Sequence, residues 1–157
     1  MKRIVCISVL LAFAASLIMA QGSNRQGVVI TGKITPNLEG KEYTEVVIEK
    51  GFPVTFTSDG KSYTIDKCKI THTDDIIFVE IFGEGVGKEW INDKGDLAVL
   101  CTYAYKGAEY RLPVIGVEEN SIVYTGVGLG RKIFYPDTLF FYPSNNGKMR
   151  KSIKVKL

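Results

Sequence analysis

The sequence predicts an all-β protein, an antiparallel β-sandwich of about ten short strands, with a small β-barrel as the alternative. Apolar and polar residues alternate along most of the chain after residue 26, and no stretch there keeps the 3.6-residue period of a helix. Glycine, asparagine and aspartate interrupt this alternation at short intervals, as turns between strands do. A length of 157 residues suits one ordinary domain.

The N-terminus has the pattern of a secretory signal peptide. Lys2 and Arg3 precede an apolar run over residues 4–20, and small residues follow. This pattern predicts cleavage between Ala20 and Gln21. The run lies at the lower limit for spanning a bilayer and has no basic cluster after it, so we expect membrane contact only before cleavage.

The predicted processing defines the domain organisation. Cleavage after Gly22 is the alternative site. We expect residues 1–20 to be the signal peptide and residues 21–157 to form a single β domain. The sequence therefore predicts an exported protein, in the periplasm, at the cell surface or outside the cell.

Charge is distributed unevenly along the mature chain. Residues 21–119 hold 16 acidic and 11 basic side chains, whereas residues 120–157 hold 7 basic and 1 acidic side chain. The mature chain therefore has a net charge of only +1. This balance, together with export, argues against a nucleic acid as the partner.

Two cysteines remain after cleavage, Cys68 and Cys101. An even number of cysteines in an exported chain predicts one disulfide between them. The alternative is a pair of buried free thiols, because cysteine packs as a small apolar side chain.

Segments with the alternating pattern of β-strands recur along the whole mature chain, and turn residues separate them. The expected strands are residues 28–35, 43–49, 52–57, 62–71, 76–82, 97–105, 108–115, 121–125, 131–142 and 149–157.

Two turns predict hairpins with defined registers. The Asp59-Gly60 turn is expected to pair Phe56 with Tyr63 and Val54 with Ile65. The second turn is Lys106-Gly107. Its expected pairs are Tyr103 with Tyr110, Cys101 with Leu112 and Val99 with Val114, which leaves Glu109 and Arg111 on the opposite face.

A third turn, Asn146-Gly147, predicts a hairpin with a basic face. Its expected pairs are Phe140 with Ile153 and Thr138 with Val155. Arg150, Lys154 and Lys156 then point away from the core and are candidate anion-binding residues. The alternative is that these charges only prevent other strands from adding to an edge.

The segment 83–95 is the longest break between strands. It is rich in glycine and contains the one tryptophan, Trp90. Trp90 is a candidate loop anchor for a partner or ligand. Alternatively, it closes the open end of the sandwich.

Three other segments contain residue types that are common in active sites. His72-Thr73-Asp74-Asp75 and Glu118-Glu119 fit turns between strands, and the glycine-rich segment 126–132 fits a bulged connection with a lesser option of anion capture by Arg131 and Lys132. The chain has one histidine, too few nitrogen and sulfur ligands for a zinc site, and no recognisable nucleophile with its base. We therefore expect no catalytic residue, no metal site and no cofactor.

Residues 28–83 contain a succession of short motifs. They are Ile30-Thr31-Gly32-Lys33-Ile34-Thr35, Val46-Val47-Ile48-Glu49-Lys50-Gly51, Thr57-Ser58-Asp59-Gly60, Tyr63-Thr64-Ile65 and Asp74-Asp75-Ile76-Ile77-Phe78-Val79. Their order resembles the carboxypeptidase regulatory-like domains of secreted bacterial proteins. The resemblance implies a transthyretin-like β-sandwich, a non-catalytic module that sits beside enzymes, adhesins or outer-membrane transporters. The family's Pro-Leu-x-Gly segment is replaced by Asn37-Leu38-Glu39-Gly40.

Together these features predict an exported, non-catalytic β-sandwich with a binding or scaffolding role at the cell envelope. The expected partner is an envelope protein or an anionic glycan. A small β-barrel that carries an apolar ligand is the alternative, and a small hydrolase ranks below it.

Overall fold

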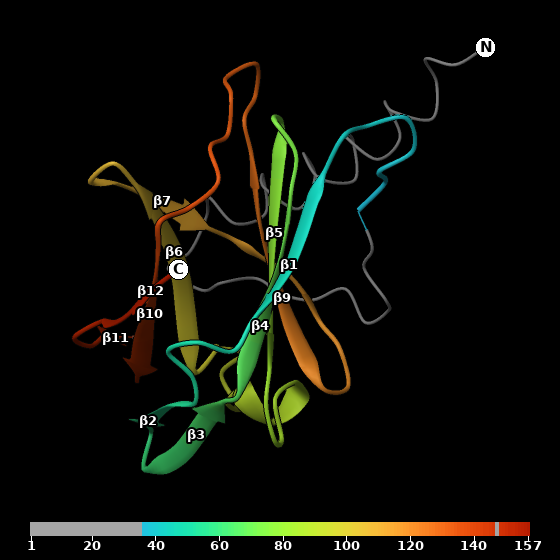
Figure 1. The fold of residues 1–157 in the computed structure, drawn as a ribbon. Coiled ribbons are helices and arrows are strands. Elements are labelled where there is room, and N and C mark those ends of the chain that lie inside the picture. Colours follow the sequence, from blue (N-terminus) through green and yellow to red (C-terminus); the bar gives the residue numbers. More distant parts are fainter. Residues whose placement is uncertain (1–35, 147) are drawn as a thin grey trace.

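The computed structural model describes residues 36–146 and 148–157, and these residues form an all-β fold (Figure 1). Twelve strands, all antiparallel to their neighbours, and one short 3-10 helix are present in this part of the chain. The expected strand at 28–35 and the expected cleavage site between Ala20 and Gln21 lie outside it. None of the helical structure in the described residues is long and apolar enough to cross a membrane.

The first sheet has five strands in the order β1-β4-β5-β9-β8. Their bounds are Thr44–Ile48 for β1, Lys67–His72 for β4, Ile76–Phe82 for β5, Ser121–Val127 for β9 and Val114–Val117 for β8. β1 and β8 form the two edges of this sheet.

The second sheet is built around β10, Thr138–Asn145, and β6, Val99–Tyr105. β7, Ala108–Leu112, pairs with β6; β11, Lys148–Met149, and β12, Ile153–Lys156, pair with β10. A separate hairpin of β2, Val54–Ser58, and β3, Lys61–Ile65, lies at the lower end of the molecule in Figure 1, and the 3-10 helix is Lys88–Trp90.

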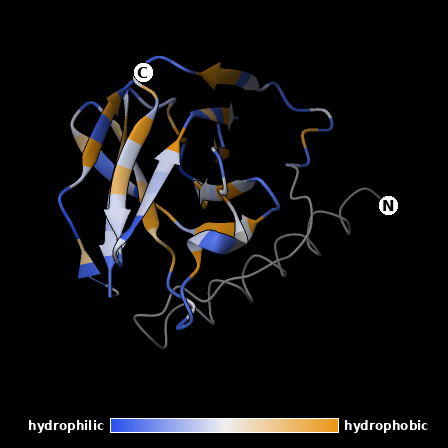
Figure 2. Cartoon of the chain, turned by 90° about the horizontal axis from the view of Figure 1, so that it is seen from below, coloured by the Kyte–Doolittle hydropathy of each residue, from blue (hydrophilic) through white to orange (hydrophobic). Residues whose placement is uncertain are grey.

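One hydrophobic core lies between the two sheets. Figure 2 shows apolar and polar segments in alternation along the strands, and the apolar side chains from both sheets are buried together. Tyr124 of β9 is fully buried, and its hydroxyl donates a hydrogen bond of 2.9 Å to the carbonyl of Val99 in β6. The interior is therefore occupied by side chains that join the two sheets.

The first two hairpins confirm most of the expected register. Phe56 is opposite Tyr63 and Val54 is opposite Ile65, around a turn in which Asp59 has a φ of 50°. The positive φ agrees with the type of turn that Asp-Gly favours. In the second hairpin, Tyr103 is opposite Tyr110 and Cys101 is opposite Leu112, as expected.

The expected strand at 108–115 is wrong in one respect, because it is two strands in two sheets. Pro113 separates β7 from β8, and it has no N–H to continue a ladder. Val114 consequently pairs with Tyr124 in the first sheet, and Val99 pairs with Pro143 in the second. The chain thus crosses from one sheet to the other at Pro113.

The third hairpin is shifted by one residue from the expected register. Asn145 and Lys148 pair next to the turn as expected, but one additional residue lies between β11 and β12. The shift places buried side chains opposite each other on the core face and turns Phe140 outward. The observed pairs are Phe141 with Ile153, Leu139 with Val155 and Phe140 with Lys154.

Two other expected strands differ in extent. The strand expected at 62–71 is divided at Asp66, whose N–H donates to the carbonyl of Phe82. The strand expected at 131–142 begins only at Thr138, because residues 128–137 form a loop along the ends of β4 and β5.

Candidate functional site

The outer face of the second sheet gathers basic and aromatic side chains from four adjacent strands. In the order β7-β6-β10-β12, alternate residues point away from the core. We call the following set the basic face: Arg111, Thr102, Phe140, Tyr142, Lys154 and Lys156.

Strand register aligns these side chains in rows. Arg111 is opposite Thr102, Thr102 is opposite Phe140, and Phe140 is opposite Lys154. With strands spaced by about 4.8 Å, this row is about 14 Å wide. Two cations therefore lie on either side of a half-buried aromatic ring.

Lys154 is held over the centre of this face. Its Nζ lies 5.7 Å from the centroid of the Phe140 ring, within the range of a cation–π interaction. Lys156 follows in the next row, opposite Thr138. The two lysines project on the same side of β12, which is an edge strand.

An acidic residue, Glu109, lies on the same side of β7 as Arg111 and is hydrogen-bonded to hydroxyls of the basic face. Glu109 Oε1 accepts hydrogen bonds from Thr102 Oγ1 and, at 2.6 Å, from the Tyr142 hydroxyl. These two bonds, that of Thr102 first, lower the pKa of Glu109. The bond to Glu109 is also the main cause that raises the pKa of Tyr142.

The cations of the basic face have no acidic partner within the described residues. Three ion pairs occur in that part of the chain, and they use the lysines at positions 41, 69 and 132. Arg111, Lys154 and Lys156 are all exposed and outside these pairs. Their charge is therefore available to an anionic ligand.

Arg150, the third predicted anion-binding residue, lies apart from the rows. It occupies the connection between β11 and β12, where its N–H donates to the carbonyl of Pro143 at 2.8 Å. Its side chain is exposed. Arg150 is thus placed beside the basic face, near the hairpin end, and Lys154 and Lys156 are placed on it.

The expected disulfide is not formed in the structure, in which Cys68 and Cys101 are free thiols. Cys68 comes from β4 and Cys101 from β6, and both are fully buried in the shared core. Burial raises the pKa of Cys68 to about 12 and raises the pKa of Cys101 well above its ordinary value. Each residue acts here as a small apolar side chain.

The prediction of Trp90 as an exposed loop anchor is wrong. Trp90 is 2% exposed and packs edge-on against Phe56 and Tyr63, with ring centroids 5.5 and 5.0 Å away. The aromatic side chains of the β2–β3 hairpin need cover at this end of the core, and Trp90 supplies it. This is the alternative placement, at the end of the sandwich.

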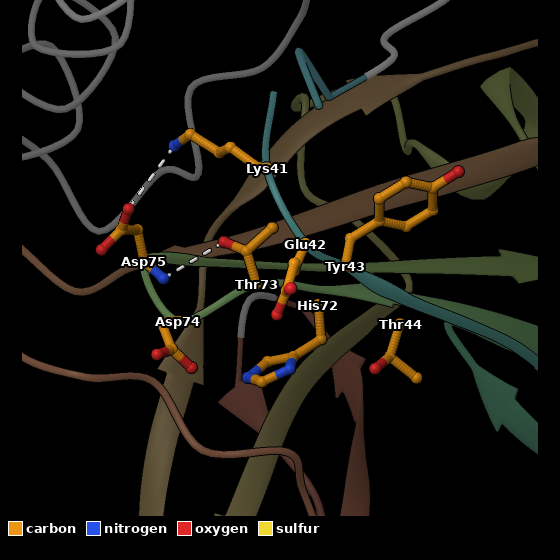
Figure 3. Close-up of a pocket in the computed structure, with 8 residues that line it drawn as sticks. All are labelled: Lys41, Glu42, Tyr43, Thr44, His72, Thr73, Asp74 and Asp75. Carbon is orange, nitrogen blue, oxygen red and sulfur yellow. Dashed lines mark hydrogen bonds and ion pairs between the residues drawn. The ribbon is translucent and has the colours of Figure 1, made fainter. Parts of the chain in front are cut away.

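A groove lies beside the turn between β4 and β5, away from the basic face. It is a groove of about 490 Å³ lined by residues 41–44 and 72–75 (Figure 3). Thr73 Oγ1 accepts hydrogen bonds from the N–H groups of Asp75 and Ile76, which confirms the expected turn. The polar groups of this turn thus stabilise it locally.

Three further polar side chains of the groove, those of His72, Asp74 and Asp75, contact the 128–137 loop or Lys41. Asp74 pairs with Lys132 at 3.0 Å, and Asp75 pairs with Lys41 at 3.5 Å. His72 Nε2 donates to the carbonyl of Ile133 at 2.8 Å, so the Nε2 nitrogen carries a proton. No group of three metal-binding side chains lies together in the residues that the structure describes.

The glycine-rich segment 126–132 connects β9 to a loop and starts no helix. Its Gly128 N–H donates to the carbonyl of Asp75, and Lys132 is bound to Asp74. These contacts tie the loop to the β4–β5 turn. The Glu118-Glu119 segment forms the expected turn, with the Glu118 N–H donating to the carbonyl of Ser121.

No family model, curated protein or solved structure matches this chain.

Sequence reasoning missed Arg111, Phe140 and Tyr142 as members of the site. Alternation placed Arg111 on the side away from the core, which was a usable signal. The pairing of β6 with β10, which brings Arg111 and Lys154 onto one surface, joins residues far apart in sequence and had no local signal.

Proposed function

We propose that this protein is an exported, non-catalytic β-sandwich that binds an anionic component of the cell envelope through its basic face. The observation that carries the proposal is the row of Arg111, Phe140 and Lys154, with cations that have no acidic partner within the described chain. The ligand class is an acidic polysaccharide or the headgroup region of a lipopolysaccharide.

The chemistry of the face suits a charged sugar chain. An aromatic ring offers a flat apolar surface to the apolar side of a sugar ring, and Phe140 and Tyr142 are both partly exposed here. The flanking cations can pair with carboxylate, sulfate or phosphate groups. A row about 14 Å wide spans more than one sugar unit.

Two further considerations support a binding role. In the family that residues 28–83 resemble, such modules are non-catalytic and accompany other envelope proteins. A carrier of apolar ligands needs an open lumen, whereas Tyr124 and Phe141 are fully buried inside this sandwich.

The proposal is tested by retention of the mature protein on beads that carry an acidic polysaccharide or lipopolysaccharide. The wild type should bind at low salt and elute as the salt approaches about 0.15 M, where the Debye length falls to about 8 Å. The double variant Lys154→Glu/Lys156→Glu should not be retained. The matched control, Lys61→Glu/Lys94→Glu, changes the net charge equally at exposed positions off the basic face and should be retained like the wild type.

Equal retention of the two double variants would remove the binding role. Lys154 and Lys156 would then serve only to protect the edge of β12, because charges of either sign block the addition of another strand.

A further inference from the structure

Glu109 places a carboxylate on the basic face, beside the cations of that face. It is exposed and points outward from β7, on the same side as Arg111. Strand register sets it in one row with Ala104, Thr138 and Lys156, so opposite charges occupy the two ends of that row. A fixed negative charge repels every anion that binds nearby. Its place on this face therefore needs a reason other than the attraction of anions.

The Glu109 carboxylate is held in position by side chains of the face itself. Its Oε1 accepts hydrogen bonds from Thr102 Oγ1 and, at 2.6 Å, from the Tyr142 hydroxyl. It forms no ion pair with Arg111 or with any other cation of the described residues. Oε2 has no hydrogen-bond partner in that part of the chain. One oxygen thus anchors the side chain, and the other can accept a hydrogen bond from a ligand.

The neighbours of Glu109 fit one acidic sugar unit. Arg111 is two residues further along β7, which separates the two Cα atoms by about 7 Å. This separation is close to the size of a sugar ring with its substituents. Arg111 can pair with the acidic group of such a unit while Glu109 accepts from a hydroxyl group of the same unit. The partly exposed rings of Phe140 and Tyr142 supply an apolar surface on the same face.

We propose that Glu109 makes the basic face selective for acidic sugars that carry free hydroxyl groups, over anions that offer charge alone. This inference rests on the proposed function and narrows its ligand to an acidic polysaccharide. Glu109 contacts the sugar, and Thr102 and Tyr142 are positioning residues that fix its carboxylate. A sugar hydroxyl offsets the repulsion by donating a charge-assisted hydrogen bond, which an ionised polyphosphate cannot donate.

The test compares two ligands by isothermal titration calorimetry of the mature protein at low salt and about pH 8. One ligand is a short oligomer of galacturonic acid, and the other is an inorganic polyphosphate of similar charge. Glu109→Gln keeps an oxygen for the hydroxyls of Thr102 and Tyr142 and removes the negative charge. It binds polyphosphate about 3-fold more tightly than the wild type, because a repulsive charge is gone. It binds the galacturonate oligomer about 5-fold more weakly, because the charge-assisted hydrogen bond is lost.

Glu84→Gln is the matched control. It removes the same charge at an exposed position in the loop after β5, off the basic face, and leaves both affinities unchanged. A Glu109→Gln protein that binds the galacturonate oligomer at least as tightly as the wild type, or that loses both ligands, overturns the selectivity and leaves the basic face as an anion site. A wild type that binds neither ligand overturns the proposed function itself, and this inference with it.

Discussion

At the scale of single residues, the charge of the basic face depends on how Glu109 is held. Its carboxylate accepts hydrogen bonds from Thr102 and Tyr142, and it forms no ion pair among the described residues. The two hydroxyls hold this carboxylate in place and, because they lower its pKa, keep it charged. Arg111 and Lys154 remain available to a ligand, which makes Tyr142 a positioning residue for the site.

Replacing Tyr142 with phenylalanine should raise the pKa of Glu109. The tyrosine hydroxyl donates to the charged carboxylate and is one of the two bonds that lower this pKa. The stability that the lowered pKa contributes is present above the ordinary carboxyl pKa and is lost as pH falls through the folded value. Titration of the Glu109 carboxyl by NMR checks the shift, and an unchanged midpoint would show that the bond has no effect on the charge.

The two thiols should react only after unfolding. Burial raises the pKa of Cys68 to about 12 and the pKa of Cys101 well above its ordinary value, and the thiolate is the reactive form. We expect no alkylation of the folded mature protein at pH 8 and two thiols alkylated per chain in denaturant. Mass spectrometry counts the added groups; a denatured chain that takes up none would indicate a bonded pair instead.

At the scale of elements, the type of turn predicted the strand register wherever the two turn residues determine it. The registers around Asp59-Gly60 and Lys106-Gly107 follow from turns that need positive φ, and the structure confirms the first fully and the second up to Leu112. The additional residue between β11 and β12 could not be predicted from the turn. It is fixed by the burial of Leu139 and Phe141 against the core, which is a tertiary effect.

Trp90 is a second case in which the local sequence did not predict a tertiary contact. Its glycine-rich surroundings indicated an exposed loop, but the rings of Phe56 and Tyr63 cover it. The contact joins a loop to a hairpin that the sequence gives no reason to place beside it.

The variant Trp90→Ala should lose about 3–5 kcal/mol of unfolding free energy, because it removes a large buried side chain. Chemical denaturation measures this loss. The folded variant should still be retained on anionic beads, since Trp90 is buried and is not part of the basic face. A folded variant that is no longer retained would contradict this expectation.

At the scale of the whole molecule, the binding surface exists only because distant strands are neighbours. Alternation gave the outward direction of Arg111 and of Lys154 within their own hairpins. Their union on one face requires β6 to pair with β10, an arrangement set by how the two sheets close over one core. The fold class could be predicted from the alternation of apolar and polar residues and from the turn residues between strands. The site depends on pairing between strands that are distant in the sequence.

The most direct test of the proposed binding role is to map by NMR where a short acidic oligosaccharide binds the mature protein. We expect amide shift changes that follow the outward residues of β7, β6, β10 and β12, are largest at Arg111, Phe140 and Lys154, and disappear at high salt. The groove at residues 41–44 and 72–75 should be unaffected. Changes confined to that groove, or no changes at any ligand concentration, would contradict the proposal that the basic face binds an anionic envelope component.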